Sequence, residues 1–142
     1  MLDDDVLANT SSSSNNYTAI WLSPDEWMIV SNNTINKENN DYKIEELLFN
    51  NISKTNLGSV TDVTDQFVTI NISGEKIFDL LSTGCPFDFS DFKSRKGAST
   101  QTLLAQIDVI IHHNEINSVN LFVRRSFSEH LMSWINDSAS RL

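Results

Sequence analysis

The sequence predicts an α+β fold, in which about three helices pack on an antiparallel or mixed sheet. Strand-like runs come in pairs joined by turn residues, at residues 18–30 and 100–123. Apolar residues at helical spacing lie between these pairs and after them. Short turns join antiparallel neighbours, and amphipathic helices must bury their apolar faces against the sheet. These two patterns together predict the fold class.

The acidic composition limits the classes of function. The chain has 142 residues, with ten Lys and Arg against nineteen Asp and Glu, for a net charge of −9. Binding to nucleic acid or to an anionic membrane surface needs clustered Lys and Arg, so we expect neither partner. The chain has no apolar run of ~18 residues and starts with acidic residues, unlike a secretory signal, so we expect a cytoplasmic protein.

The first third of the chain predicts a tail, a hairpin and a loop. Residues 1–16 are acidic and then rich in Ser and Asn, which predicts a mobile tail before a single domain at residues 17–142. Residues 18–22 and 27–30 are short apolar runs on either side of Ser23-Pro24-Asp25-Glu26, and they predict a β-hairpin. The Asn-rich residues 31–40 predict a loop.

Two helices and a strand are expected next. A helix starts near Asp41, with Asn40 or Asp41 as its N-cap and Gly58 just beyond its end. Residues 66–72 alternate and predict a half-buried strand. A second helix follows Ser73-Gly74 and ends at Gly84, a left-handed terminator. The apolar stripes are Ile44, Leu47, Leu48 and Ile52 in the first helix, and Ile77, Phe78, Leu80 and Leu81 in the second.

The C-terminal part predicts a loop, strands and a last helix. Residues 89–98 form a polar loop with the basic residues Lys93, Arg95 and Lys96. Residues 100–111 are β-prone and bend or split near Gln106, and a hairpin at 114–117 leads to a strand at 118–123. Ser126 and Glu129 fit a capping box. The stripe of the helix is Phe127, His130, Leu131, Trp134 and Ile135.

The histidines do not predict a metal site. Adjacent side chains in a strand point to opposite faces, so His112 and His113 do not readily share one ion. His130 lies on or beside the last apolar stripe, which favours a packed, hydrogen-bonded histidine over a catalytic base. The four glycines form neither a dinucleotide-binding motif nor a phosphate loop.

Three further groups have a chemical and a structural interpretation. Cys85, the only cysteine, excludes an internal disulfide and a cysteine-based zinc site. It follows a helix C-terminus, where a thiolate is not stabilised, so a small buried residue is favoured over a nucleophile. Asp62 and Asp65 suit turn capping better than acid–base catalysis. Arg124-Arg125 suits a salt bridge within or between chains better than an anion site.

Five segments, read together, resemble the gamma subunit of heterotetrameric sarcosine oxidase. They are WLSPDEW at 21–27, VTDVTD at 60–65, LLSTGCPFD at 80–88, QTLLA at 101–105 and VRRSF at 123–127. They occur in the order of that family, and the resemblance runs from about Trp21 to Trp134, which is most of the chain. Phe87 replaces the family's leucine in the Gly-Cys-Pro-Leu-Asp turn, and the Asn-rich tail and the loop at 31–40 also depart from the family.

The resemblance implies a non-catalytic structural subunit. The complex oxidatively demethylates sarcosine to glycine, with hydrogen peroxide and either formaldehyde or methylenetetrahydrofolate as products. FAD, NAD, covalent FMN, tetrahydrofolate and zinc are expected on the other subunits and none on this chain. The main partner is the alpha subunit, with beta and delta in the same heterotetramer. The fold is related to part of the folate-binding aminomethyltransferases.

Contact candidates and rival functions complete the expectations. The family-like segments least explained by a core stripe are the turn at 84–88 and the arginine pair. The candidate contacts with a partner subunit are therefore Gly84, Cys85, Pro86, Asp88, Arg124 and Arg125. No catalytic, cofactor-binding or metal-binding residue is expected. The rivals are a stand-alone folate or one-carbon-binding protein and a small hydrolase that uses Cys85 with a histidine.

Overall fold

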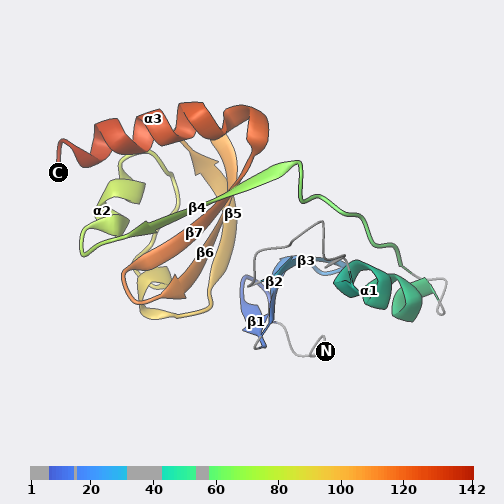
Figure 1. Ribbon diagram of the computed structural model, residues 1–142. Helices are drawn as coiled ribbons and strands as arrows, with labels where there is room; N and C mark the ends of the chain where they lie inside the picture. The colour runs from blue at the N-terminus through green and yellow to red at the C-terminus, as the bar shows by residue number, and fades with distance from the viewer. Residues whose placement is uncertain (1–6, 15, 32–42, 54–57) are drawn as a thin grey trace.

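A computed structural model describes residues 7–14, 16–31, 43–53 and 58–142 (Figure 1). The strands are β1 (Ser11–Ser13), β2 (Tyr17–Ser23), β3 (Glu26–Ser31), β4 (Phe67–Ser73), β5 (Ser99–Leu104), β6 (Ile107–Glu115) and β7 (Ser118–Arg124). The helices are α1 (Lys43–Ser53), α2 (Ile77–Ser82) and α3 (Ser128–Ala139), with 3₁₀ turns at Phe92–Ser94 and Arg125–Phe127. None of the helices in these ranges has the length and apolarity to cross a membrane.

The strands form two sheets in which all neighbours are antiparallel. One has the order β1-β2-β3 and the other the order β4-β7-β6-β5. The α+β class and both hairpins are therefore confirmed, and the sheets are antiparallel rather than mixed. The predicted break near Gln106 is the turn between β5 and β6, where Ala105 and Gln106 have φ angles of 52° and 66°. Two consecutive left-handed residues are typical of a tight hairpin turn.

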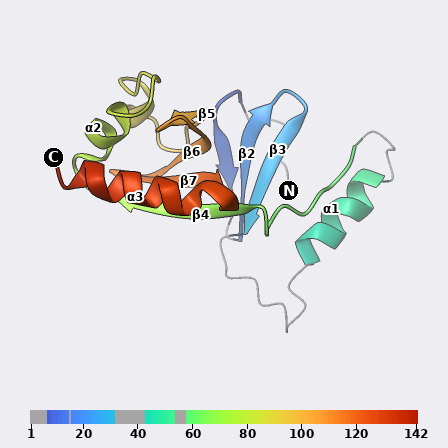
Figure 2. The ribbon, with the colours of Figure 1, turned by 90° about the horizontal axis from the view of Figure 1, so that it is seen from above.

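The four-stranded sheet lies between α2 and α3 on one side and the three-stranded sheet on the other (Figures 1 and 2). Residues alternate between the two faces of each strand. Ile111 in β6 belongs to the main apolar cluster together with Leu131 of α3. Its neighbour Ile110 faces the other way and packs with Phe122 of β7 and Ile20 of β2. The face opposite the helices is therefore the one that meets the second sheet.

The two sheets are also joined at one edge by residues of the expected tail. The Ser99 backbone N–H donates to the Asn9 carbonyl at 2.8 Å, and the Ser99 hydroxyl donates to the Thr10 carbonyl at 3.3 Å. Ser11–Ser13 form β1 and pair with β2. The prediction of a mobile tail is therefore wrong for residues 9–13, since backbone pairing does not require apolar side chains. Residues 1–6 lie outside the described residues.

The first helix is confirmed as α1. Leu48 is buried, whereas Leu47 is 47% exposed. The expected caps Asn40 and Asp41, and the loop at 31–40 apart from Ser31, lie outside the described residues. Ser31 is the last residue of β3.

The loop at 89–98 is less polar in structure than its composition predicts. Phe89 and Phe92 are buried and belong to the main apolar cluster. Their rings contact each other at 5.5 Å between centroids, and each contacts Phe78 and Phe87. These aromatic contacts anchor the loop on the same side of the sheet as α2.

The start of α3 differs from the predicted capping box. The helix begins at Ser128 after the 3₁₀ turn, and no side chain caps its N-terminus. The Ser128 hydroxyl donates to the Arg125 carbonyl at 2.8 Å. The prediction for Ser126 and Glu129 is wrong because the 3₁₀ turn supplies local backbone bonds in place of a side-chain cap.

Only part of the predicted α3 stripe is buried. Leu131 and Ile135 lie in the core and Trp134 packs against it, but Phe127 is 48% exposed. His130 is also exposed, so the prediction of a packed, hydrogen-bonded histidine is wrong. Phe127 belongs to the 3₁₀ turn, whose tighter winding breaks the 3.6-residue phase.

Gly84 follows the end of α2, whose C-cap is Thr83, and it is not the predicted left-handed terminator. Its φ is not in the left-handed region, where the described glycines are Gly74 and Gly97. A β-carbon at position 84 would overlap the ring of Trp134 in α3. Glycine therefore allows α3 to approach the end of α2 closely.

Candidate functional site

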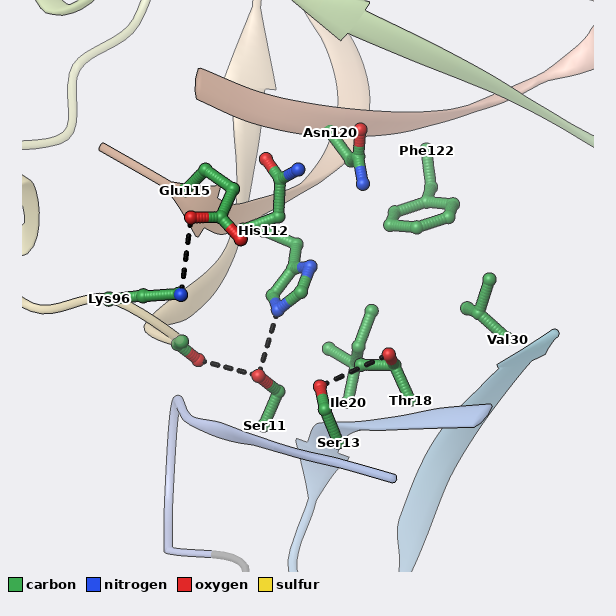
Figure 3. Close-up of a pocket in the computed structure, with 12 residues that line it drawn as sticks. Ser11, Ser13, Thr18, Ile20, Val30, Lys96, His112, Glu115, Asn120 and Phe122 are labelled. Atoms are coloured by element: carbon green, nitrogen blue, oxygen red, sulfur yellow. Dashed lines mark hydrogen bonds and ion pairs between the residues drawn. The ribbon is translucent and has the colours of Figure 1, made fainter. Parts of the chain in front are cut away.

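A pocket of about 500 Å³ lies between the two sheets (Figure 3). Its residues come from β1, β2 and β3 on one side, and from β6, β7 and the segment before β5 on the other. The lining consists of Ser11, Ser13, Thr18, Ile20, Val30, Lys96, Gly97, His112, Asn114, Glu115, Asn120 and Phe122. The volume is within the range of pockets that hold small molecules.

His112 is the most buried polar side chain of this pocket, with 6% of its surface exposed. Its Nε2 lies 2.8 Å from the Ser11 Oγ, and the Ser11 hydroxyl lies 2.8 Å from the Gly97 carbonyl oxygen. A carbonyl only accepts, so the serine proton goes to Gly97 and the His112 Nε2–H donates to Ser11. The Nδ1 atom of His112 is then a hydrogen-bond acceptor.

Burial keeps this imidazole uncharged at neutral pH. Loss of water around His112 lowers its pKa from 6.5 to about 4, and the neighbouring His113 contributes to the same shift. A buried imidazole loses more hydration when it is charged than when it is neutral. The pocket therefore presents a neutral acceptor at Nδ1.

Asn120 contributes a donor beside this acceptor. The Asn71 Nδ2 donates to the Asn120 Oδ1 at 2.8 Å and to the Val119 carbonyl at 3.3 Å. Because a backbone carbonyl only accepts, these bonds assign the oxygen of the Asn120 amide. Its NH₂ group points toward the pocket (Figure 3). Asn120 is the direct cross-strand partner of His112, so the donor and the acceptor are neighbours on one face.

The charged residues of the pocket lie at its rim and pair with each other. The Lys96 Nζ is 3.2 Å from the Glu115 Oε2, and the two side chains are 61% and 64% exposed. Arg95 pairs with Asp91 at 3.2 Å. Two members of the basic group Lys93, Arg95 and Lys96 therefore have acidic partners, and the group does not act as one uncompensated anion site.

His113 points to the opposite face of β6, as the strand geometry predicts. Its Nδ1 is 3.2 Å from the Phe92 carbonyl oxygen and 2.9 Å from that of Arg95, so this nitrogen carries the proton. The rings of Phe78 and Phe92 pack on it. The two adjacent imidazoles cannot bind one ion from opposite faces. Within residues 7–14, 16–31, 43–53 and 58–142, no three His, Cys, Asp or Glu side chains gather as metal ligands.

The model of the "Sarcosine oxidase, gamma subunit family" matches residues 4–141. The chain belongs to this family. A chain of a solved structure, "Heterotetrameric Sarcosine Oxidase from Corynebacterium sp. U-96 in complex with pyrrole 2-carboxylate", has the same fold, with a TM-score of 0.83 and 20% sequence identity. The similarity covers 96% of this chain and 66% of the other, so this chain spans just under two thirds of its length. No curated protein sequence matches significantly.

The turn at 84–88, one of the segments that resemble the gamma-subunit family, is divided between core and surface. Cys85 is a free, buried cysteine whose Sγ lies 3.6 Å from the Thr102 Oγ1. The structural interpretation of Cys85 is therefore confirmed. Pro86 and Asp88 are exposed. The Asp88 carboxylate accepts from the Ser90 hydroxyl at 2.7 Å and from the Ser90 N–H at 2.9 Å, and the hydroxyl bond is the main cause of its lowered pKa.

The second gamma-subunit-like segment, Arg124-Arg125, lies at the surface before α3. The Arg125 Nε donates to the Asp65 backbone carbonyl at 3.0 Å, and the Arg124 guanidinium lies 5.9 Å from the Phe67 ring centroid. Asp62 accepts from the Thr64 N–H at 3.0 Å and so caps a turn, as predicted. The arginines flank the N-terminal end of α3, whereas Gly84 meets its middle, so these segments occupy different positions along the helix.

The pocket is the feature that the sequence analysis missed. Its key residues come from positions as far apart as Ser11 and Asn120. A local signal exists, because His112 and Asn120 interrupt strands that are otherwise largely apolar on both faces. That signal does not predict a pocket by itself, because only the strand register places the two residues opposite each other.

Proposed function

We propose that this chain is the non-catalytic gamma subunit of a heterotetrameric sarcosine oxidase, acting as a single structural domain that includes β1 as well as the predicted residues 17–142. The observation that carries the proposal is the family match over residues 4–141. The shared fold supports it. The other subunits are alpha, beta and delta, with alpha as the main partner.

The complex would oxidise the N-methyl group of sarcosine. Two electrons pass from the substrate to oxygen, which becomes hydrogen peroxide, and water releases the methyl carbon as formaldehyde and leaves glycine. Tetrahydrofolate, where present, captures this carbon as methylenetetrahydrofolate. FAD, FMN, NAD, the folate and zinc belong to the other subunits, and the assembly works in the cytoplasm.

The chain would contribute to this reaction by stabilising its partner. A subunit that binds only the folded form of its partner shifts that partner's folding equilibrium by mass action. The chemistry of the described residues supports a structural role. The Ser11, His112 and His113 side chains hydrogen-bond within the chain, and the Cys85 thiol is buried against Thr102. The folate-binding alternative has no specific observation in its favour.

Reconstitution tests the function. The alpha, beta and delta subunits are co-expressed with and without this chain, and sarcosine-dependent peroxide formation and the melting temperature of the alpha subunit are measured. We expect the chain to raise that melting temperature and the yield of active complex, and to form no peroxide by itself. Peroxide formation by the isolated chain, or an alpha subunit unaffected by it, would contradict the proposal.

The contact surface is tested separately. We propose that the partner subunit contacts the segments that contain Gly84, Cys85, Pro86, Asp88, Arg124 and Arg125, in which the exposed groups supply the direct contacts. Replacing Arg124 and Arg125 by Ala should reduce co-purification with the alpha subunit at least tenfold, because two exposed guanidinium groups are lost. Arg95→Ala, at an exposed arginine with a local Asp91 partner, is the control. Unchanged co-purification of the double variant would remove the arginines from the interface.

A further inference from the structure

The inner wall of the pocket between the sheets combines two unlike polar groups with an apolar surface. His112 is nine-tenths buried, and its Nδ1 is an acceptor that makes no hydrogen bond within the described part of the chain. Asn120 directs its NH₂ donor into the same space (Figure 3). Ile20 and Phe122 are almost completely buried around them, and Val30 lies opposite.

The arrangement of these groups specifies the ligand's polar end. His112 and Asn120 are directly opposed in the register of β6 and β7. A ligand that satisfies both must carry an N–H donor and a carbonyl acceptor close together. A primary carboxamide has both on atoms bonded to one carbon, and it leaves neither wall group without a partner. A buried polar group that loses water without gaining a partner opposes binding.

The charges argue for an uncharged ligand. The charged side chains that line the pocket within the described residues, Lys96 and Glu115, are exposed and paired with each other at the rim. The inner wall consists of neutral polar and apolar groups. A charged ligand would lose its hydration there without gaining an opposite charge.

We propose that this pocket binds a small uncharged molecule with a primary carboxamide attached to an apolar group. The carboxamide N–H donates to the His112 Nδ1, and its oxygen accepts from the Asn120 NH₂. The apolar group packs against Ile20, Val30 and Phe122. The pocket does not include the contact segments proposed above. A failure to bind the carboxamide and a failure to assemble with the alpha subunit are therefore separate results.

The test uses the full chain and three probes of similar shape. Benzamide has the N–H donor and the carbonyl, methyl benzoate lacks the N–H and is neutral, and benzoate is charged. Binding is followed by ligand-observed NMR and by the His112 ring resonances. We expect saturable benzamide binding with a Kd on the order of millimolar, as for a fragment of this size. Methyl benzoate and benzoate should bind at least tenfold more weakly.

Variants assign the binding to the two polar groups. His112→Phe keeps a ring but loses the acceptor, and Asn120→Ala loses the donor, so each should weaken benzamide binding at least tenfold. His130→Phe, at an exposed histidine on α3, is the matched control and should bind like the wild type. Circular dichroism checks that each variant folds. If His112→Phe does not fold, Asn120→Ala by itself tests the proposal. Three results would overturn the proposal: no binding of benzamide, binding of methyl benzoate as tight as that of benzamide, or wild-type affinity for benzamide in a folded His112→Phe or Asn120→Ala variant.

Discussion

The adjacent histidines of β6 have different environments, although they are chemically the same. His112 faces the second sheet and bonds to Ser11, whereas His113 faces the aromatic residues on the helix side. Alternation along the strand separates them, as the sequence predicts. Each environment depends on residues that are distant in sequence, since Ser11 is 101 positions from His112.

His112 should make the stability of the chain depend on pH. Its folded pKa is about 4 and its ordinary value is 6.5, so between these values the unfolded chain binds a proton that the folded chain does not. The free energy of unfolding should therefore fall as the pH drops from 6.5 to 4, by up to about 3 kcal/mol from this group. The groups near it are His113 and the Lys96–Glu115 pair. Urea unfolding at pH 7 and pH 4.5 measures the change.

The control for this pH effect compares two histidine variants. His112→Phe has no group to titrate at this position, so its loss of stability between the two pH values should be smaller than that of the wild type. His130→Phe should retain the full loss, because His130 is exposed on α3. An equal loss in wild type and His112→Phe would show that His112 does not cause the dependence.

At the scale of elements, α3 packs closely against the chain where α2 ends. Gly84 lies against the Trp134 ring of α3, and its carbonyl accepts from the Ala105 N–H at 2.9 Å. One residue thus touches both the last helix and the turn between β5 and β6. The turn at 84–88 also carries Cys85, whose small buried side chain faces Thr102 of β5. These contacts explain the Gly-Cys sequence without a catalytic role.

Gly84→Ala should destabilise the chain by about 1–3 kcal/mol, because the added methyl group overlaps Trp134 and forces the ring to move. In a Trp134→Leu background the same substitution should have a smaller effect, since the ring is gone. Urea unfolding of the four proteins in this double-mutant cycle gives the coupling energy. A loss of less than about 0.5 kcal/mol for Gly84→Ala alone would contradict the steric explanation.

At the scale of the whole molecule, the chain is a layered structure with one central sheet. Helices α2 and α3 cover one face of the four-stranded sheet, and the three-stranded sheet covers the other (Figure 1). The described residues bury the cysteine and two of the three histidines within these layers. This arrangement suits the proposed role of a structural subunit, whose surface segments bind partners while its interior maintains the shape.

Most elements of the fold follow from local patterns in the sequence. The two hairpins, the three helices and the break near Gln106 depend on period-two and period-3.6 patterns, which neighbouring residues carry by themselves. The five ordered segments also identify the family. Local patterns did not predict β1, which depends on backbone hydrogen bonds to β2 rather than on a pattern of apolar side chains. They also did not predict the start of α3 or the exposure of His130, where a 3₁₀ turn before the helix changes the helical periodicity.

The sequence alone thus determined most of the secondary structure, the separation of His112 from His113 and the family. Only the tertiary structure decided that Ser11 meets His112, that Asn120 stands opposite His112, and that Gly84 makes room for Trp134. The physical reason is the range of the interactions. Periodicity and turn preferences act within a few residues, whereas a pocket or a close packing contact requires the register of strands and the packing of layers from distant parts of the chain.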